Sequence, residues 1–240
     1  MALTDNLISF FEFESGAILV DAVGAANNLT DVNTVTSVTG KVGNGSHFVS
    51  SSSQTLKHAS NTSLQMGDID FSIALWIKIV SAGGGVQQCF VSKWNGATDN
   101  REYMVEINDT TVAKAEFRVS NNGVAVKTAV TTASISSGTY GFVVAYHDSV
   151  NNLIGVSLNG AAAQTASHTT GVLAGSAEFR VGSLGTDAAF LNGDLDQVGI
   201  WKRVLSSAEI TTLYNSGNGL SYAAMGVVSL PLPLSTMSWF

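Results

Sequence analysis

The stretch Asn192–Gly219, NGDLDQVGIWKRVLSSAEITTLYNSGNG, changes its hydrophobic pattern halfway along. In its first part, apolar side chains roughly alternate with polar ones, as expected for a strand with one buried face. These apolar residues are Leu195, Val198, Ile200 and Trp201. The polar residues between them include Asp194 and Asp196. The first part therefore predicts a half-buried strand.

The second part predicts a short helix. Its apolar residues have helical spacing, at positions i, i+3 and i+4: Ile210, Leu213 and Tyr214. Ser206 is a suitable N-cap, and Glu209 three residues later completes a capping box. Gly217 supplies a C-terminal stop. We therefore expect the strand to run directly into a single capped helix of about two to three turns.

The order of residues in this stretch resembles the closing segment of laminin-G-like domains of the concanavalin A-like jelly-roll superfamily. The matching residues are Gly193, Leu195, Asp196, Val198, Ile200, Trp201, Arg203, Leu205, Ser206, Glu209, Ile210, Leu213 and Tyr214. The resemblance implies an all-β fold, a two-sheet antiparallel jelly-roll sandwich with one short C-terminal helix. It implies less about function, because lectins, enzyme-appended modules and viral structural proteins share this fold.

Upstream segments extend the resemblance. Asp70–Lys78, DFSIALWIK, matches the family's central strand, and Gly40–Phe48 and Ile154–Gly160 match two of its hairpins. Further strand patterns follow at hairpin spacing, bounded by Asn-Gly and Asn-Asn turns. We therefore expect one jelly-roll domain over residues 1–222 and an extended apolar tail over residues 223–240.

Two tryptophans, Trp76 and Trp94, are candidates for stacking against a sugar ring. Trp76 lies on the face of its strand opposite to Phe71 and Leu75. Either both faces of that strand are covered, or Trp76 lies on a concave surface. A core position is the favoured interpretation of Trp76, and a sugar-stacking platform is the alternative.

Calcium is the one cofactor that the resemblance implies. The implied site joins an Asp-x-x-Gly-x-x-Asn loop to the late Asp-containing strand, which places Asp21, Asn27 and Asp196 around the ion. Glu14 is a further candidate ligand. Such an ion would be structural, because it would tie the first strand to the last. In the alternative interpretation, Asp21 initiates a turn and Asp196 caps backbone amides.

The composition narrows the range of partners. The chain of 240 residues carries 11 basic and 18 acidic side chains without a basic cluster, so a nucleic-acid partner is not expected. The single cysteine, Cys89, excludes an intrachain disulfide. No apolar run has the length of a membrane span, and residues 1–15 lack a secretory-signal pattern. We therefore expect a soluble protein made in a cytoplasm, without membrane insertion.

No catalytic pair is recognised in the sequence. Superfamily members that cut glucans carry two carboxylates on one strand, one on each side of the glycosidic bond. The motif Glu-x-Asp-x-Glu does not occur here. The nearest same-face pairs are Glu12 with Glu14 and Asp194 with Asp196. Both pairs fall where the family places scaffold or calcium residues, so we predict a protein that is not an enzyme.

The C-terminal tail provides a docking hypothesis. Residues 220–240 are apolar and uncharged and contain both prolines of the chain, which favour an extended conformation. We expect this tail to pack on its own sandwich or, as the preferred interpretation, on a neighbouring chain. The predicted docking residues are Leu230, Leu232, Leu234, Trp239 and Phe240.

Three functions follow from these patterns. The favoured one is a non-enzymatic structural or binding module of a virus particle, such as a capsid decoration, head-fibre or tail-associated protein. Its partners would be copies of itself or other virion proteins, and its location the virion. The second function is a free-standing lectin that binds a glycan. The third is a glycoside hydrolase with an unusual carboxylate pair.

Overall fold

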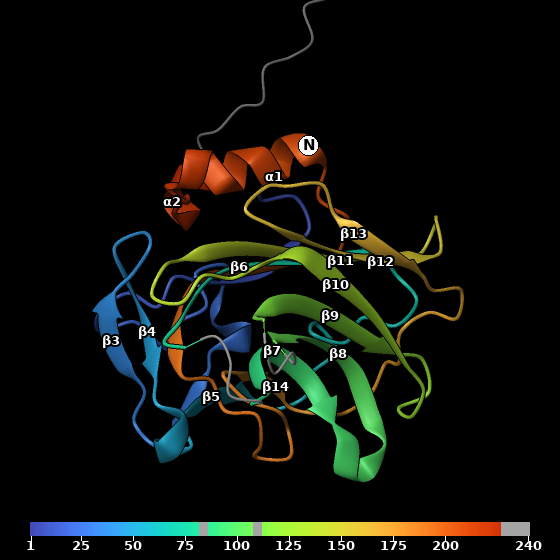
Figure 1. The fold of residues 1–240 in the computed structure, drawn as a ribbon, viewed down its shortest axis with the longest axis horizontal. Helices are drawn as coiled ribbons and strands as arrows, with labels where there is room; N and C mark the ends of the chain where they lie inside the picture. Colours follow the sequence, from blue (N-terminus) through green and yellow to red (C-terminus); the bar gives the residue numbers. More distant parts are fainter. Residues whose placement is uncertain (82–85, 108–111, 227–240) are drawn as a thin grey trace, which may run out of the picture.

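The computed structural model describes residues 1–81, 86–107 and 112–226. Over these ranges the chain forms two antiparallel sheets, of eight and seven strands, packed face to face. Figure 1 shows the two layers, with the helices α1 and α2 above the sheet that contains β6 and β11. The predicted two-sheet, all-β fold is therefore confirmed.

The strands of the first sheet, in spatial order, are β13 (Gln164–Ser167), β12 (Leu153–Leu158), β11 (Gly141–Asp148), β6 (Phe71–Ile79), β15 (Gly193–Trp201), β4 (Asn44–Phe48) and β3 (Thr36–Thr39). A further strand, β1 (Leu7–Phe11), also pairs with β15. The last strand of the chain is thus central, because β15 has β6 along one side and β4 and β1 along the other.

The strands of the second sheet, in spatial order, are β10 (Val126–Ser134), β9 (Lys114–Ser120), β8 (Asn100–Ile107), β7 (Gln88–Asn95), β14 (Phe179–Val181), β5 (Thr55–His58) and β2 (Thr30–Val32). Short 3₁₀ turns lie at Ala25–Asn27, Ser50–Ser52, Gly96–Thr98 and Asn215–Gly217. Three of the six pairings join strands that follow one another in the sequence, and the predicted turns at Asn95-Gly96 and Asn121-Asn122 lie in the links from β7 to β8 and from β9 to β10.

The main core lies between the sheets. On β6 the alternation places Phe71, Ile73 and Leu75 in this core, each with 0% of its surface exposed. Trp76 points the opposite way, into a second apolar cluster on the outer face, where it meets Leu213 of α1. Both faces of β6 are therefore covered, which was one of the two alternatives for this strand.

The helix α1 (Ser207–Tyr214) begins as the sequence predicts. The Ser206 hydroxyl accepts a hydrogen bond from the Glu209 N–H at 3.3 Å, and the Glu209 carboxylate accepts one from the Ser206 N–H at 2.8 Å. The α-helix ends at Tyr214, and its C-cap is Asn215, whose φ of 48° is left-handed. A 3₁₀ turn continues from Asn215 to Gly217, the predicted stop, whose φ of 87° is also left-handed. Asparagine tolerates this conformation, so no glycine is required there.

Two features extend this packing beyond the prediction. A second helix of one turn, α2 (Tyr222–Met225), follows α1, where we expected only one helix. Its Met225 has 1% of its surface exposed and joins the outer cluster, so packing continues past residue 222. At the other end of the chain, Trp201 Nε1 donates to the Leu3 carbonyl at 2.7 Å, and Arg203 Nε donates to the Asp5 carbonyl at 2.7 Å. The N-terminal residues are therefore held against the link between β15 and α1.

Candidate functional site

Both tryptophans predicted as stacking platforms are buried. Trp76 has 2% of its surface exposed, and its ring stacks on Tyr214 with centroids 5.7 Å apart. Lys41 lies over the same indole, with Nζ at 4.9 Å from the ring centroid. Trp94 is 6% exposed and packs in a small outer cluster with Cys89, Met104 and Leu184. The core interpretation of Trp76 therefore agrees with the structure, whereas a stacking role for either ring does not.

The four predicted calcium ligands separate into two pairs. The first pair, Asp21 and Asn27, holds the loop that follows the first strand. Asp21 Oδ1 accepts a hydrogen bond from the Phe10 N–H at 2.9 Å, and Asn27 Nδ2 donates to the Ser9 hydroxyl at 2.7 Å. Both side chains therefore fasten this loop to β1.

The second pair, Glu14 and Asp196, holds the turn between β3 and β4. Asp196 Oδ2 accepts hydrogen bonds from the N–H groups of Lys41 and Val42, at 2.7 and 2.8 Å. Glu14 Oε2 accepts one from the Asn44 N–H at 3.1 Å. Burial raises the pKa of Asp196 to about 7, and these N–H donors act in the opposite direction.

This arrangement does not fit the predicted calcium site. Calcium takes six to eight oxygen ligands, whereas the oxygens described above accept hydrogen bonds from N–H groups in two separate places. Within the described ranges no three acidic, His or Cys side chains are grouped so that they could hold a metal ion. No hydrogen bond or ion pair joins Asp21 to Asp196 there. The contacts match the alternative interpretation, in which Asp21 initiates a turn and Asp196 caps backbone amides. Binding of a calcium ion stays a prediction.

The two carboxylate pairs considered for catalysis are engaged in contacts that hold the fold. Asp194 contacts Nδ1 of His47 at 2.5 Å and forms an ion pair with Lys78. Glu12 accepts a hydrogen bond from the Tyr222 N–H at 2.9 Å, at the start of α2. Both carboxylates thus connect neighbouring elements on the outer side of the first sheet.

A third carboxylate pair, Glu102 and Glu106 on β8, was not predicted, although their Glu-x-x-x-Glu spacing is visible in the sequence. Both residues have 0% of their surface exposed. Glu102 forms an ion pair with Lys93, and Glu106 Oε1 lies 2.9 Å from Arg118 Nε. Burial raises the pKa of each carboxyl to about 7. Neither group is open to a substrate, so their contacts are structural.

The predicted docking residues of the tail lie outside the described residues: Leu230, Leu232, Leu234, Trp239 and Phe240. The docking hypothesis therefore stays a prediction. No helix within the described ranges is both long enough and apolar enough to cross a membrane.

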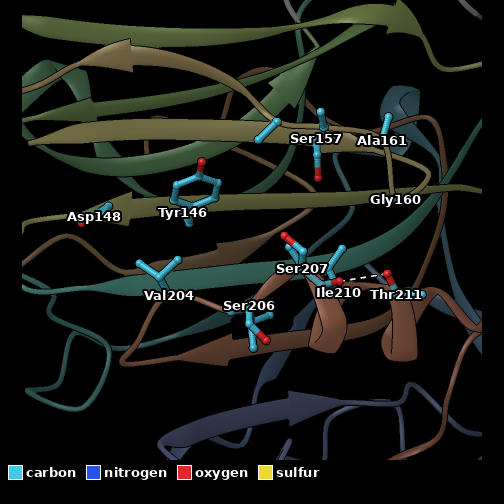
Figure 2. Close-up of a pocket in the computed structure, with 13 residues that line it drawn as sticks. Tyr146, Asp148, Ser157, Gly160, Ala161, Val204, Ser206, Ser207, Ile210 and Thr211 are labelled. Carbon is cyan, nitrogen blue, oxygen red and sulfur yellow. Dashed lines mark hydrogen bonds between the residues drawn. The ribbon is translucent and has the colours of Figure 1, made fainter. Parts of the chain in front are cut away.

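A pocket lies between the hairpin of β11 and β12 and the start of α1, and we call it the tyrosine pocket (Figure 2). Its volume is about 540 Å³, within the range of about 300–1,000 Å³ that is usual for ligand pockets. Its lining consists of Tyr146, Asp148, Ser157, Ile210, Thr211 and residues 160–163 and 204–207. Figure 2 shows Tyr146 and Ser157 on the strands, with Ser207 and Thr211 opposite them on the helix.

The floor of the tyrosine pocket is an aromatic ring supported by a glycine. Tyr146 on β11 pairs directly with Gly155 on β12. A Cβ atom added at Gly155 would lie 2.4 Å from Tyr146 Cζ and 2.6 Å from its hydroxyl oxygen. Because this side chain is absent, the ring lies across β12 with one face on the backbone. The ring is half-buried and lines the pocket.

Several polar groups of the pocket have no hydrogen-bond partner among the residues that the structure describes. The hydroxyl groups of Tyr146, Ser157 and Ser207 make no hydrogen bond with any other described residue. Asp148 is held at the edge, where its two oxygens accept hydrogen bonds from the N–H and side-chain amide of Asn151, at 2.8 and 2.7 Å. Burial, and then the charge of Asp148, raises the pKa of Tyr146, so its hydroxyl stays protonated. The pocket thus offers one apolar ring face beside neutral hydroxyl groups.

The sequence analysis missed this pocket, although part of its signal was readable. The hairpin of residues 141–158 turns at Asn151-Asn152, and that turn fixes a register in which Tyr146 opposes Gly155. An aromatic residue opposite a glycine on one sheet face predicts a ring lying across the neighbouring strand. The contribution of α1 to the pocket depends on tertiary packing and was not readable from the hairpin alone.

Comparison with known proteins agrees with this architecture. The family model described as "Concanavalin A-like lectin/glucanases superfamily" matches residues 49–211 of the chain. A search of curated proteins finds no match. One similar solved structure is the binding domain of Paraclostridial Mosquitocidal Protein 1, with a TM-score of 0.74 and 19% identity, covering 90% of this chain and 53% of that one.

Two other structures show the same fold. The receptor binding domain of botulinum neurotoxin mosaic serotype C/D has a TM-score of 0.71 and 15% identity, over 89% of this chain and 51% of its own. Domain 4 of a GH43 extracellular arabinanase from Geobacillus stearothermophilus, solved with arabinotriose, has a TM-score of 0.66 and 16% identity, over 86% and 97%. The chain thus spans about half of the two toxin domains and nearly all of the arabinanase domain.

Proposed function

The chain belongs to the concanavalin A-like lectin/glucanase superfamily, and we propose that it is a non-enzymatic module that binds a carbohydrate in the tyrosine pocket. The two toxin structures are titled as binding domains, and the arabinanase domain was solved with a sugar bound. At these identities the likeness concerns the fold alone, so the proposal rests on the chemistry of the pocket.

The observation that carries the proposal is the ring of Tyr146 on the bare backbone of Gly155. A sugar ring has an apolar face of C–H groups and a rim of hydroxyl groups. Stacking on an aromatic face, together with short polar side chains at the rim, satisfies both. Tyr146 supplies the face, and Ser157, Ser207 and Asp148 supply partners for the rim.

Electrostatics favours a neutral sugar over an anionic one. Asp148 is the only charged side chain that lines the tyrosine pocket within the described ranges, and the chain carries a net charge of −7. An anionic sugar would be repelled by this carboxylate, whereas a neutral hydroxyl group can donate a hydrogen bond to it. We therefore propose a neutral sugar as the ligand.

A glycan array tests the proposal with three variants. Wild type is expected to bind a set of neutral glycans, and Tyr146→Ala to bind them at least about tenfold more weakly because the stacking face is lost. Tyr146→Phe keeps the ring and is expected to retain most of the binding. The matched control is Tyr140→Ala, because Tyr140 lies beside Lys78 and does not line the pocket.

The result that would overturn the proposal is equally direct. If wild type binds no neutral glycan, or if Tyr146→Ala binds as well as wild type, the tyrosine pocket is not a carbohydrate site. Thermal unfolding of each variant separates a loss of binding from a loss of fold. Incubation of the bound glycan with wild type, followed by chromatography, tests the non-enzymatic part, since cleavage would assign catalysis.

The virion-associated role is a second candidate, and the composition of the tail favours it. Residues 227–240 carry no charged side chain and are rich in leucine, which suits burial against another protein. In that role the sandwich would be a module of an assembly, joined to it through the tail. Sugar binding by the tyrosine pocket is compatible with this role, so the two candidates are tested separately.

A further inference from the structure

The tyrosine pocket has a smaller neighbour on the other side of the turn between β12 and β13. This hollow, which we call the threonine hollow, has a volume of about 100 Å³. It is lined by Thr131, Thr132 and Ala133 of β10 and by Gln164 at the start of β13, together with part of β12. Ser157, Ala161 and Ala162 line both spaces. The two spaces are therefore adjacent parts of one surface.

Ser157 marks the junction of the two spaces. It has 4% of its surface exposed, and its hydroxyl makes no hydrogen bond with any described residue. Its oxygen is not enclosed by the protein and is open to the two spaces that Ser157 lines. A ligand that crosses the junction can therefore form a hydrogen bond with this hydroxyl group. This unpartnered group is independent of the ring of Tyr146 and points to the same surface.

The far end of the surface also carries polar groups without partners. The side chains of Gln164 and Thr132 make no hydrogen bond with other residues of the described ranges. Between these groups and Ser157 lie Ala161 and Ala162, whose side chains are single methyl groups. Two sets of polar groups are thus separated by the small apolar side chains of Ala161 and Ala162. We call these two residues the apolar step, and no large side chain lies between the polar groups.

We infer that the ligand is a linear oligosaccharide of at least two sugar units, one on Tyr146 and the next crossing Ser157 toward Gln164. The inference rests on the proposed function and adds the size of its ligand. The threonine hollow is smaller than the pockets of about 300 Å³ or more that enclose a ligand by themselves, so it binds only the edge of the second unit. We therefore expect the affinity for a sugar to increase when a second unit is added.

A chain-length series tests the inference. Mono-, di- and trisaccharides of arabinose, xylose, glucose, mannose and galactose are titrated against wild type by calorimetry. The disaccharide of the preferred sugar is expected to bind about tenfold more tightly than its monosaccharide, as one or two added hydrogen bonds allow. Gln164→Ala is expected to reduce this gain, and Ala162→Trp to remove it by filling the step.

The controls use an exposed neighbour on the same strand. Thr165 follows Gln164 on β13, is exposed, and lines neither space. Thr165→Ala and Thr165→Trp are therefore expected to keep the gain with chain length. Gln164→Ala is expected to bind the monosaccharide within about twofold of wild type, because the contacts with Tyr146 are unchanged.

The outcomes separate the inference from the proposed function. Binding that depends on Tyr146 but is equal for all chain lengths overturns the inference and leaves the function standing. The inference is likewise overturned, with the function intact, if Ala162→Trp keeps the full gain. If no sugar of the series binds, the proposed function and the inference fall together. If Gln164→Ala and Ala162→Trp reduce the gain in affinity with chain length and the Thr165 variants do not, the result supports both the inference and the proposed function.

Discussion

The carboxyl group of Asp196 is expected to make the stability of the sandwich depend on pH. Its residue has 0% of its surface exposed, and burial raises its pKa to about 7. In the unfolded chain the same group titrates near pH 4. Between these two values the folded protein holds one proton more than the unfolded chain. Raising the pH across this interval therefore lowers the free energy of unfolding.

The size of the effect follows from the two pKa values. The stabilisation is fully present below about pH 4 and is lost as the pH rises through about 7, at about 1.4 kcal/mol per pH unit. The total is about 4 kcal/mol, which is a large part of the stability of an ordinary domain. Asp196→Asn removes the titration but keeps an oxygen that can accept from the N–H groups of Lys41 and Val42.

The assay is urea unfolding of wild type and Asp196→Asn between pH 4 and pH 8, followed by tryptophan fluorescence. Glu102 and Glu106 also titrate near pH 7, but they are present in both proteins and cancel in the difference. From pH 4 to pH 8, the free energy of unfolding of Asp196→Asn is expected to rise by up to about 4 kcal/mol relative to that of wild type. A difference that stays constant with pH would show that the hydrogen-bond donors of Lys41 and Val42 outweigh burial.

Four further expectations concern single features of the molecule. Ser206→Ala should lower the free energy of unfolding by about 1 kcal/mol in urea titrations, because the cap of α1 is lost, and an unchanged midpoint would contradict this. Gly155→Ala should displace the ring of Tyr146 and weaken glycan binding by about tenfold or more in calorimetry, and equal affinity would refute the proposed floor of the pocket. Excess EDTA should shift the melting temperature by less than about 1 °C, whereas a fall of several degrees would support the calcium prediction. Deletion of residues 227–240 should leave a folded domain with a lower oligomeric mass by light scattering, and unfolding or an unchanged mass would count against the docking hypothesis.

The fold was readable from sequence because its signals are local. The capping box of Ser206 and Glu209 and the alternation on β6 depend on neighbouring residues alone, and both occur in the structure. The predicted stop at Gly217 marks the end of the 3₁₀ turn, whereas the α-helix itself already ends before Asn215. Asn215 adopts the left-handed conformation first, although glycine is the more common residue there.

The candidate site was less readable because it combines distant segments. Trp76 was ambiguous in the sequence, since burial under α1 depends on how Tyr214 packs across the sheet. The carboxylates of Asp21 and Asp196 could have held an ion or capped backbone amides, and only their contacts separate these possibilities. The tyrosine pocket needed the register of one hairpin together with the position of a helix.

The central position of β15 determines when the first sheet can form during synthesis on the ribosome. Until residues 193–201 have emerged, β6 and β4 each lack one of their two neighbours, and β1 lacks the strand with which it pairs. A nascent chain therefore exposes open strand edges until β15 has been made, and such edges are prone to aggregation. We expect chains truncated before Gly193 to be held by chaperones or degraded, whatever the strength of their earlier hairpins.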